Sequence, residues 1–208
     1  MILYVETNFL LEIARQQDHA QEAEELLLLG SDRSRLRLFC PAHCIGEAAA
    51  NIGYHHQERL PLLVSLQKQQ RELGRYAIES GLTDLIGKLD SRMHAVRKHE
   101  EWRLEQTVEK LLRFDGALPT PYLACGDAAE FELEYELRFS DALLLATVIR
   151  HARTLSEELK AFVSRDRKDF GGRVAREVLR RENIKYLTTF EAALALAKRH
   201  RGEPGKSD

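Results

Sequence analysis

Four acidic residues stand out because of their neighbours, and together they would suit metal-dependent hydrolysis. Glu6 and Asp166 each follow a short apolar run, whereas Glu47 lies among isoleucine, glycine and alanine. Asp141 immediately precedes the run Ala142-Leu143-Leu144-Leu145-Ala146. Two carboxylates about 4 Å apart repel by roughly 4 kcal/mol at an effective dielectric of about 20. A cluster of four would therefore take up protons or bind a hard cation such as Mg²⁺ or Mn²⁺.

With one or two such ions, the cluster would cut a phosphodiester through metal-activated water and would need no side-chain nucleophile. The residues also allow a structural interpretation, in which each acid caps a helix or pairs with an arginine. For Asp141, which follows Ser140, the helix-cap interpretation is as good as the catalytic one. Spacing along the chain does not decide whether the four acids meet.

The apolar runs predict strands over 2–5, 36–39, 160–164 and 184–187. Short helices are expected over 9–14, 20–29, 43–53, 128–138, 140–151, 173–181 and 189–196. Thr7 and Asn8 are expected to cap the first helix, and 116–122 to form a loop. Strands separated by helices pair in parallel, and ligands bind outside the carboxyl ends of such strands. Glu6 and Asp166 would stand at this edge.

The middle of the chain predicts a helical hairpin. Apolar residues recur at three- and four-residue steps from Leu82 to Leu111, which indicates a helix of about thirty residues, roughly 45 Å long. Ser80-Gly81 separates this helix from an earlier one over 62–78. We therefore expect one α/β domain over 1–200, with a helical insertion over 55–115 and a disordered tail over 201–208.

Four segments of the chain resemble, in order, the motifs of PIN-domain nucleases. They are Tyr4-Val5-Glu6-Thr7-Asn8-Phe9-Leu10-Leu11, the small-residue helix around Glu47, Ser140-Asp141-Ala142-Leu143-Leu144-Leu145-Ala146, and Phe162-Val163-Ser164-Arg165-Asp166-Arg167-Lys168-Asp169-Phe170. The resemblance covers both ends of the chain and leaves the stretch from Tyr54 to Glu136 weakly matched. It implies a three-layer α/β/α sandwich with a central parallel sheet and a ribonuclease site that uses Mg²⁺ or Mn²⁺.

The same resemblance assigns roles to individual residues. Catalysis and metal binding would belong to Glu6, Glu47, Asp141 and Asp166. Asn8 and Ser164 would support them by hydrogen bonding, and Asp169 would be a more distant metal ligand. Many PIN-domain proteins are toxins held by a cognate antitoxin, so an antitoxin is one partner that the resemblance implies.

Two features depart from the family pattern. The first acid is usually aspartate, and Glu6 moves the carboxylate outward by one methylene, which Mg²⁺ tolerates badly. The long helical segment between Glu47 and Asp141 indicates a larger subgroup than the compact toxin type. The first departure keeps a rival open, a catalytically weak or silent PIN-like module that binds nucleic acid or protein. A phosphatase or nucleotide-binding protein is disfavoured because no glycine-rich phosphate loop follows any predicted strand.

Charge and cysteine content bear on partners and location. The net charge of −2 does not predict a large basic face for duplex DNA, but Arg165, Arg167 and Lys168 next to Asp166 would suit RNA phosphates. Three cysteines without disulfide spacing, and no basic leader, favour a reducing cytosol. Cys40, His43 and Cys44 are interpreted as structural groups rather than a zinc site, since no second Cys/His cluster is present. The helical surfaces are compatible with a homodimer.

Overall fold

A five-stranded, all-parallel sheet forms the centre of the molecule. The computed structural model describes residues 1–73, 80–155, 158–166, 170 and 172–200. The strands are β1 (Ile2–Tyr4), β2 (Arg37–Pro41), β3 (Ala117–Leu118), β4 (Lys160–Val163) and β5 (Ile184–Leu187). Their order across the sheet is β3-β2-β1-β4-β5, and every pair is parallel. The predicted parallel α/β fold is confirmed.

The short edge strand β3 lies where the sequence predicts a loop. Two residues are too few to show the alternation that marks a strand, so its pairing depends on a neighbour supplied by the fold. The carbonyl of Gly116 accepts a hydrogen bond from the Cys40 amide at 2.8 Å. A Cβ at Gly116 would come within 2.8 Å of the Leu38 carbonyl oxygen, so glycine permits this close approach to β2.

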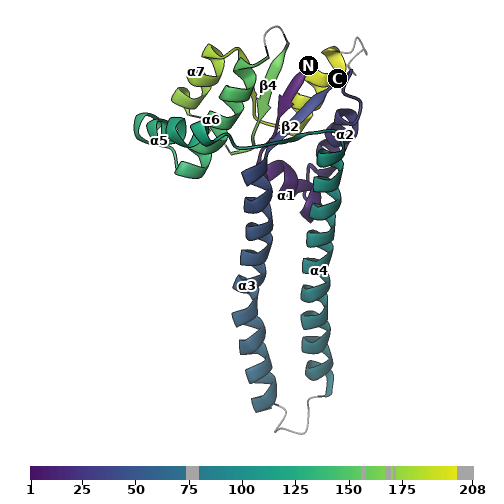
Figure 1. The fold of residues 1–208 in the computed structure, drawn as a ribbon. Helices are drawn as coiled ribbons and strands as arrows, with labels where there is room; N and C mark the ends of the chain where they lie inside the picture. The colour runs from purple at the N-terminus through teal and green to yellow at the C-terminus, as the bar shows by residue number, and fades with distance from the viewer. Residues whose placement is uncertain (74–79, 156–157, 167–169, 171, 201–208) are drawn as a thin grey trace.

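Helices lie on both faces of the sheet. They are α1 (Thr7–Arg15), α2 (Ala20–Gly30), α5 (Tyr122–Tyr135), α6 (Phe139–Arg153), α7 (Arg173–Arg181) and α8 (Phe190–His200). Helix α2 packs on α8, whereas α5 packs on α6 and α7 on β5. Figure 1 shows α5, α6 and α7 on one side of the strands and α1 and α2 on the other. This arrangement is compatible with an α/β/α sandwich.

The strand order creates a switch point between β1 and β4. From β1 the chain adds β2 and then β3 outward on one side, and it then returns to place β4 and β5 on the other side. In open α/β sheets, ligands bind in the crevice at the carboxyl ends of the two strands where the direction reverses. Glu6 and Asp166 are the predicted site residues that follow these two strands.

A long helical hairpin projects from the α/β body (Figure 1). Its two helices are α3 (Ala42–Leu73) and α4 (Ser80–Arg113), which pack side by side. The 34 residues of α4 correspond to about 51 Å, somewhat longer than predicted. The C-terminal part of α4, which is its upper part in Figure 1, also contacts α1 and α2, and this joins the hairpin to the body.

Helix α3 corrects one prediction. The sequence predicts separate helices over 43–53 and 62–78, but α3 is continuous over 32 residues with Pro61 inside it. A proline inside a helix costs about 3 kcal/mol because it lacks an N–H and its ring collides with the preceding turn. The buried side chains of Ile52, His56 and Leu63 provide the packing that outweighs this cost. The stretch 74–79 and the tail 201–208 lie outside the described residues.

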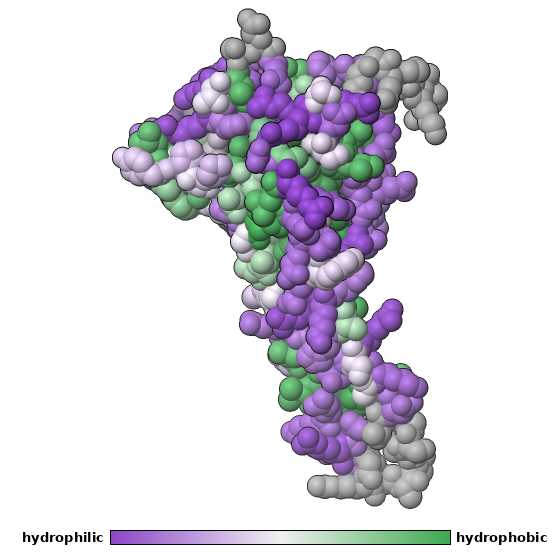
Figure 2. All heavy atoms as spheres, turned by 45° about the vertical axis from the view of Figure 1, so that its right-hand side comes forward, coloured by the Kyte–Doolittle hydropathy of each residue, from purple (hydrophilic) through white to green (hydrophobic). Residues whose placement is uncertain are grey.

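The surface of the hairpin is mostly hydrophilic, with scattered hydrophobic side chains (Figure 2). Leu62, Val64 and Leu85 are among its exposed apolar residues. No described helix combines the length and the apolar character needed to cross a membrane.

Candidate functional site

Glu6 is a buried acid at the carboxyl end of β1. Glu6 is only 4% exposed. It is the N-cap of α1, a position for which the sequence predicts Thr7 and Asn8. Its Oε2 accepts a hydrogen bond from the Asn8 amide at 2.7 Å. Its Oε1 is buried and has no hydrogen-bond partner among the described residues.

The environment of Glu6 disfavours its charged form. Burial raises the pKa of this carboxyl to about 8, and the neighbouring Cys44 thiol adds to the rise. The Asn8 amide and the side chains of Ser164 and Asn8 oppose it. Asn8 and Ser164 thus lie beside Glu6, as their predicted supporting role requires.

Glu47 lies on α3 and is held by α1. The Thr7 hydroxyl donates a hydrogen bond of 2.6 Å to Glu47 Oε2. Contact with Cys44 and burial raise the pKa of the Cys40 thiol, and the charges of Glu6 and Glu47 raise it further. Both carboxylates therefore lie near one thiol at the end of β2.

Asp141 faces the same region from α6. Burial lowers the pKa of His43, but Cys44, Glu47 and Asp141 together raise it above its ordinary value. His43 also pairs through Nδ1 with the Thr120 hydroxyl at 3.2 Å. Helix α6 begins at Phe139 with Arg138 as its N-cap, so Asp141 lies in the first turn and is not the cap.

Asp166 is placed by the turn that follows β4. Its amide donates to the Ser164 hydroxyl at 3.0 Å. The Tyr186 hydroxyl donates to the carbonyls of Ser164 and Asp166 at 3.2 and 3.3 Å. Because Ser164 also adjoins Glu6, this turn brings the ends of β4 and β1 together.

The four acids share one edge of the sheet without forming a tight ligand sphere. Among the described residues, only His19, Glu22 and Glu191 have metal-ligating atoms that all lie within 4.8 Å of one another. That group lies between α2 and α8, where His19 pairs with Glu191 at 2.6 Å. Like charges repel, so carboxylates without a cation between them are expected to stand apart.

The predicted phosphate-binding residues are only partly described. Arg165 Nη1 is 2.5 Å from Glu12 Oε2, and the arginine side chain is 38% exposed. Part of its charge is therefore neutralised within the fold. Arg167 and Lys168, together with the predicted metal ligand Asp169, lie outside the described residues.

Cys40, His43 and Cys44 lie close together near the site and affect one another's charge. Cys40 and Cys44 are buried cysteines outside any disulfide. The pKa of Cys44 falls to about 6, however, because Cys40, His43 and Thr7 stabilise its thiolate against the opposing effect of burial.

Glu12 is a buried acid that is not among the predicted site residues. It is 1% exposed, and besides Arg165 it accepts the His19 amide at 2.7 Å through Oε1. It stands among Phe9, Leu10, Leu11, Ile13 and Ala14. The signal that selects Glu47, an acid in apolar company, also marks Glu12, and here it indicates a structural ion pair.

Replacing Glu12 by glutamine is expected to lower the free energy of unfolding by about 2 kcal/mol, because Arg165 loses its charged partner. Urea denaturation measures this loss. The matched variant Glu158→Gln removes the exposed pair with Arg37 and should cost less than about 1 kcal/mol. Equal losses in the two variants would contradict a special role for the buried pair.

The chain was compared with family models, with curated proteins and with solved structures. None of the three comparisons found a match. The function is therefore inferred from the chemistry of the residues at the sheet edge.

Proposed function

We propose that this protein is a divalent-metal-dependent endoribonuclease with a PIN-like fold. The observation that carries the proposal is Glu6, a buried carboxyl at the switch point of a parallel sheet whose Oε1 has no protein partner among the described residues. A buried carboxylate oxygen without a donor is costly unless a proton or a cation satisfies it. A bound cation would satisfy this oxygen, and it would also explain why other acids lie nearby.

The donor set fits a hard cation. Glu6, Glu47, Asp141 and Asp166 offer carboxylate oxygens, which Mg²⁺ and Mn²⁺ prefer. A divalent cation bound there would supply an acidified water and stabilise negative charge at a phosphodiester. Asp169, as a more distant ligand, stays part of the proposal.

The protein's own side chains would set the position and charge of these ligands. The Asn8 amide fixes one oxygen of Glu6, and the Thr7 hydroxyl fixes one oxygen of Glu47. Hydrogen bonds of this kind orient metal ligands and contribute to affinity. Ser164 holds the turn that carries Asp166. Because Glu6 is buried, water does not reach its Oε1. Cation binding is then the alternative to protonation.

RNA as the substrate rests on the resemblance to PIN domains. Arg165, Arg167 and Lys168 are proposed to contact its phosphates, with Arg165 weakened in this role by Glu12. A cytosolic location and a cognate antitoxin belong to the same proposal.

A second candidate function is a catalytically silent PIN-like module that binds nucleic acid or protein. Two observations favour it: Glu6 stands where the family has aspartate, and the four carboxylates do not converge within 4.8 Å. In this case Glu6 would stay protonated near neutral pH, in keeping with its raised pKa. Such a module would need no cation.

Cation-dependent cleavage separates the two candidates. The full-length protein is incubated with a mixed RNA pool in Mg²⁺, Mn²⁺ or EDTA, and its thermal unfolding is followed in the same buffers. We expect cleavage and an increase in Tm with Mn²⁺ or Mg²⁺, and neither in EDTA, because a ligand bound only to the folded state stabilises it. Absence of both effects at saturating Mn²⁺ would exclude the nuclease and leave the silent module.

A further inference from the structure

Helix α5 presents an apolar stripe to solvent. Tyr122 and Leu133 are 84% and 85% exposed, and Gly126 and Ala129 between them are exposed as well. Steps of four, three and four residues place all four on one face of the helix. The opposite face, with Ala124 and Ala128, is buried. Two large, almost fully exposed side chains joined by Gly126 and Ala129 make this face a candidate contact surface.

The same helix is strongly acidic. It contains Asp127, Glu130, Glu132 and Glu134 and no lysine or arginine. Asp127 forms an ion pair with Arg150 of α6, whereas the three glutamates are exposed beside the apolar stripe. A surface that binds α5 would therefore be apolar in its middle and basic at its edge.

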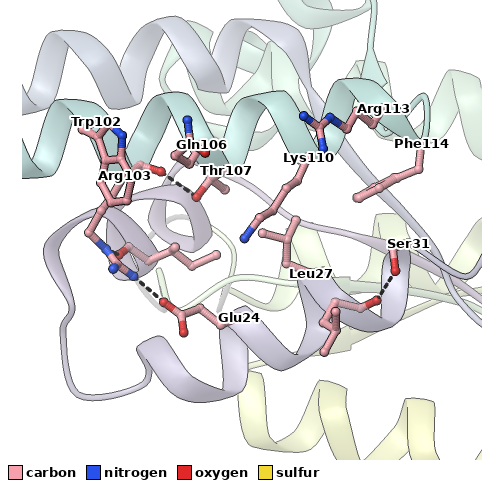
Figure 3. A pocket seen from close by; sticks show the side chains of 12 residues that line it. Glu24, Leu27, Ser31, Trp102, Arg103, Gln106, Thr107, Lys110, Arg113 and Phe114 are labelled. Atoms are coloured by element: carbon pink, nitrogen blue, oxygen red, sulfur yellow. Dashed lines mark hydrogen bonds and ion pairs between the residues drawn. The ribbon is translucent and has the colours of Figure 1, made fainter.

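A groove with these properties lies between α2 and α4 (Figure 3). Its volume is about 550 Å³, and Ile13, Leu27 and Phe114 are buried apolar residues in its lining. Leu28 and Trp102 line it as well and are 71% and 52% exposed. Both the helix and the groove thus expose large apolar side chains.

The charges of the groove are opposite to those of α5. Its lining contains Arg103, Lys110 and Arg113 against one carboxylate, Glu24. Arg103 pairs with Glu24, and Arg113 with Glu109. Lys110 has no ion-pair partner among the described side chains, and Figure 3 shows it extending across the groove toward Leu27. An incoming carboxylate would therefore find a cation ready to pair.

We propose that α5 of one copy of this chain binds in the α2–α4 groove of a second copy. Trp102 and Lys110 are eight residues apart along α4, as Tyr122 and Glu130 are along α5. Eight residues rise about 12 Å in both helices, so an α5 parallel to α4 aligns the aromatic pair and the Lys110–Glu130 pair together. An apolar helix face in a groove with complementary charges is a recurrent mode of recognition.

The contact is head to tail. Figure 1 shows α5 at one end of the α/β body and α2 with the upper part of α4 at the other. One molecule therefore offers its helix to one neighbour and its groove to another, which produces closed rings or open chains. Association should strengthen with protein concentration and weaken as salt screens the charges.

Sedimentation of the full-length protein over a wide concentration range tests the proposal. The wild type should associate. Lys110→Glu and Glu130→Lys should each weaken association by about tenfold or more, and the double variant should recover most of it. Lys98→Glu is the matched control, because it reverses an exposed α4 charge outside the groove lining and should change nothing. All three positions are exposed, and circular dichroism checks folding.

Trp102 gives a second readout, because it is the only tryptophan in the chain. Its emission should shift to shorter wavelength as association buries it. A wild type that is monomeric throughout the range overturns the proposal. So does association that is indifferent to both charge reversals, or a double variant that does not recover.

Discussion

Replacing Asp141 by asparagine is expected to lower cation-dependent RNA cleavage by about a hundredfold or more. The substitution keeps the shape of the side chain and one oxygen, but it removes the negative charge. Groups that merely orient metal ligands already contribute about 10- to 100-fold, so loss of a proposed ligand should reach at least the upper end. Asp141 lies in the first turn of α6 and acts electrostatically on His43, near Glu47.

Initial rates of RNA cleavage in Mn²⁺, with wild type and variant purified in parallel, measure this effect. Asp84→Asn is the matched control, because Asp84 is exposed on the hairpin, where it pairs with Lys88. Its activity should equal that of the wild type. Equal cleavage by wild type and Asp141→Asn would mean that the activity comes from a contaminant or from another site.

Replacing Glu6 by glutamine is expected to stabilise the protein at alkaline pH when no divalent cation is present. The pKa of Glu6 is raised from 4.5 to about 8 in the folded state. Below about pH 4.5, Glu6 is protonated in both states and costs nothing. As the pH rises toward 8, the unfolded chain releases this proton first, so the folded state loses stability relative to the unfolded state. A shift of this size corresponds to about 5 kcal/mol.

Glutamine keeps the hydrogen bond from the Asn8 amide and never ionises, so the variant escapes this loss. In EDTA, urea denaturation should find Glu6→Gln more stable than the wild type at pH 8.5, with the difference vanishing near pH 5. The exposed variant Glu105→Gln should follow the wild type. Mn²⁺ should stabilise the wild type and leave Glu6→Gln unchanged. If the wild type instead gains stability relative to Glu6→Gln between pH 5 and 8.5 in EDTA, the claim that Glu6 is a buried carboxyl that needs a cation is refuted.

Local sequence was sufficient for β1, β2, β4 and β5 and for the place of two predicted site residues. The runs Ile2–Tyr4 and Lys160–Val163 are apolar enough to form buried strands without help from context. Because parallel strands share one carboxyl edge, the acids that follow them had to lie at that edge. Apolar neighbours then marked Glu47 and Asp141, both of which are half-buried in the structure.

The same signal could not separate a proposed site residue from an acid in a structural ion pair. Glu12 and Glu47 both lie in apolar helices, yet Glu12 meets Arg165 and Glu47 meets Thr7. Those partners are 153 and 40 residues away in the chain. Partner identity at such separations is decided by how the helices dock, which no local pattern encodes.

The amino-acid sequence by itself therefore determined the spacing of apolar residues that distinguishes helices from strands. It also determined the order of the acids along the chain. The tertiary structure alone decided that Glu6 is the cap of α1 and that its buried Oε1 has no hydrogen-bond partner in the described part of the chain. It alone decided that β3 joins the sheet and that α3 continues through Pro61. The physical reason is the same in each case. Backbone preferences act within a few residues, whereas burial, desolvation and pairing depend on which distant segments are brought into contact.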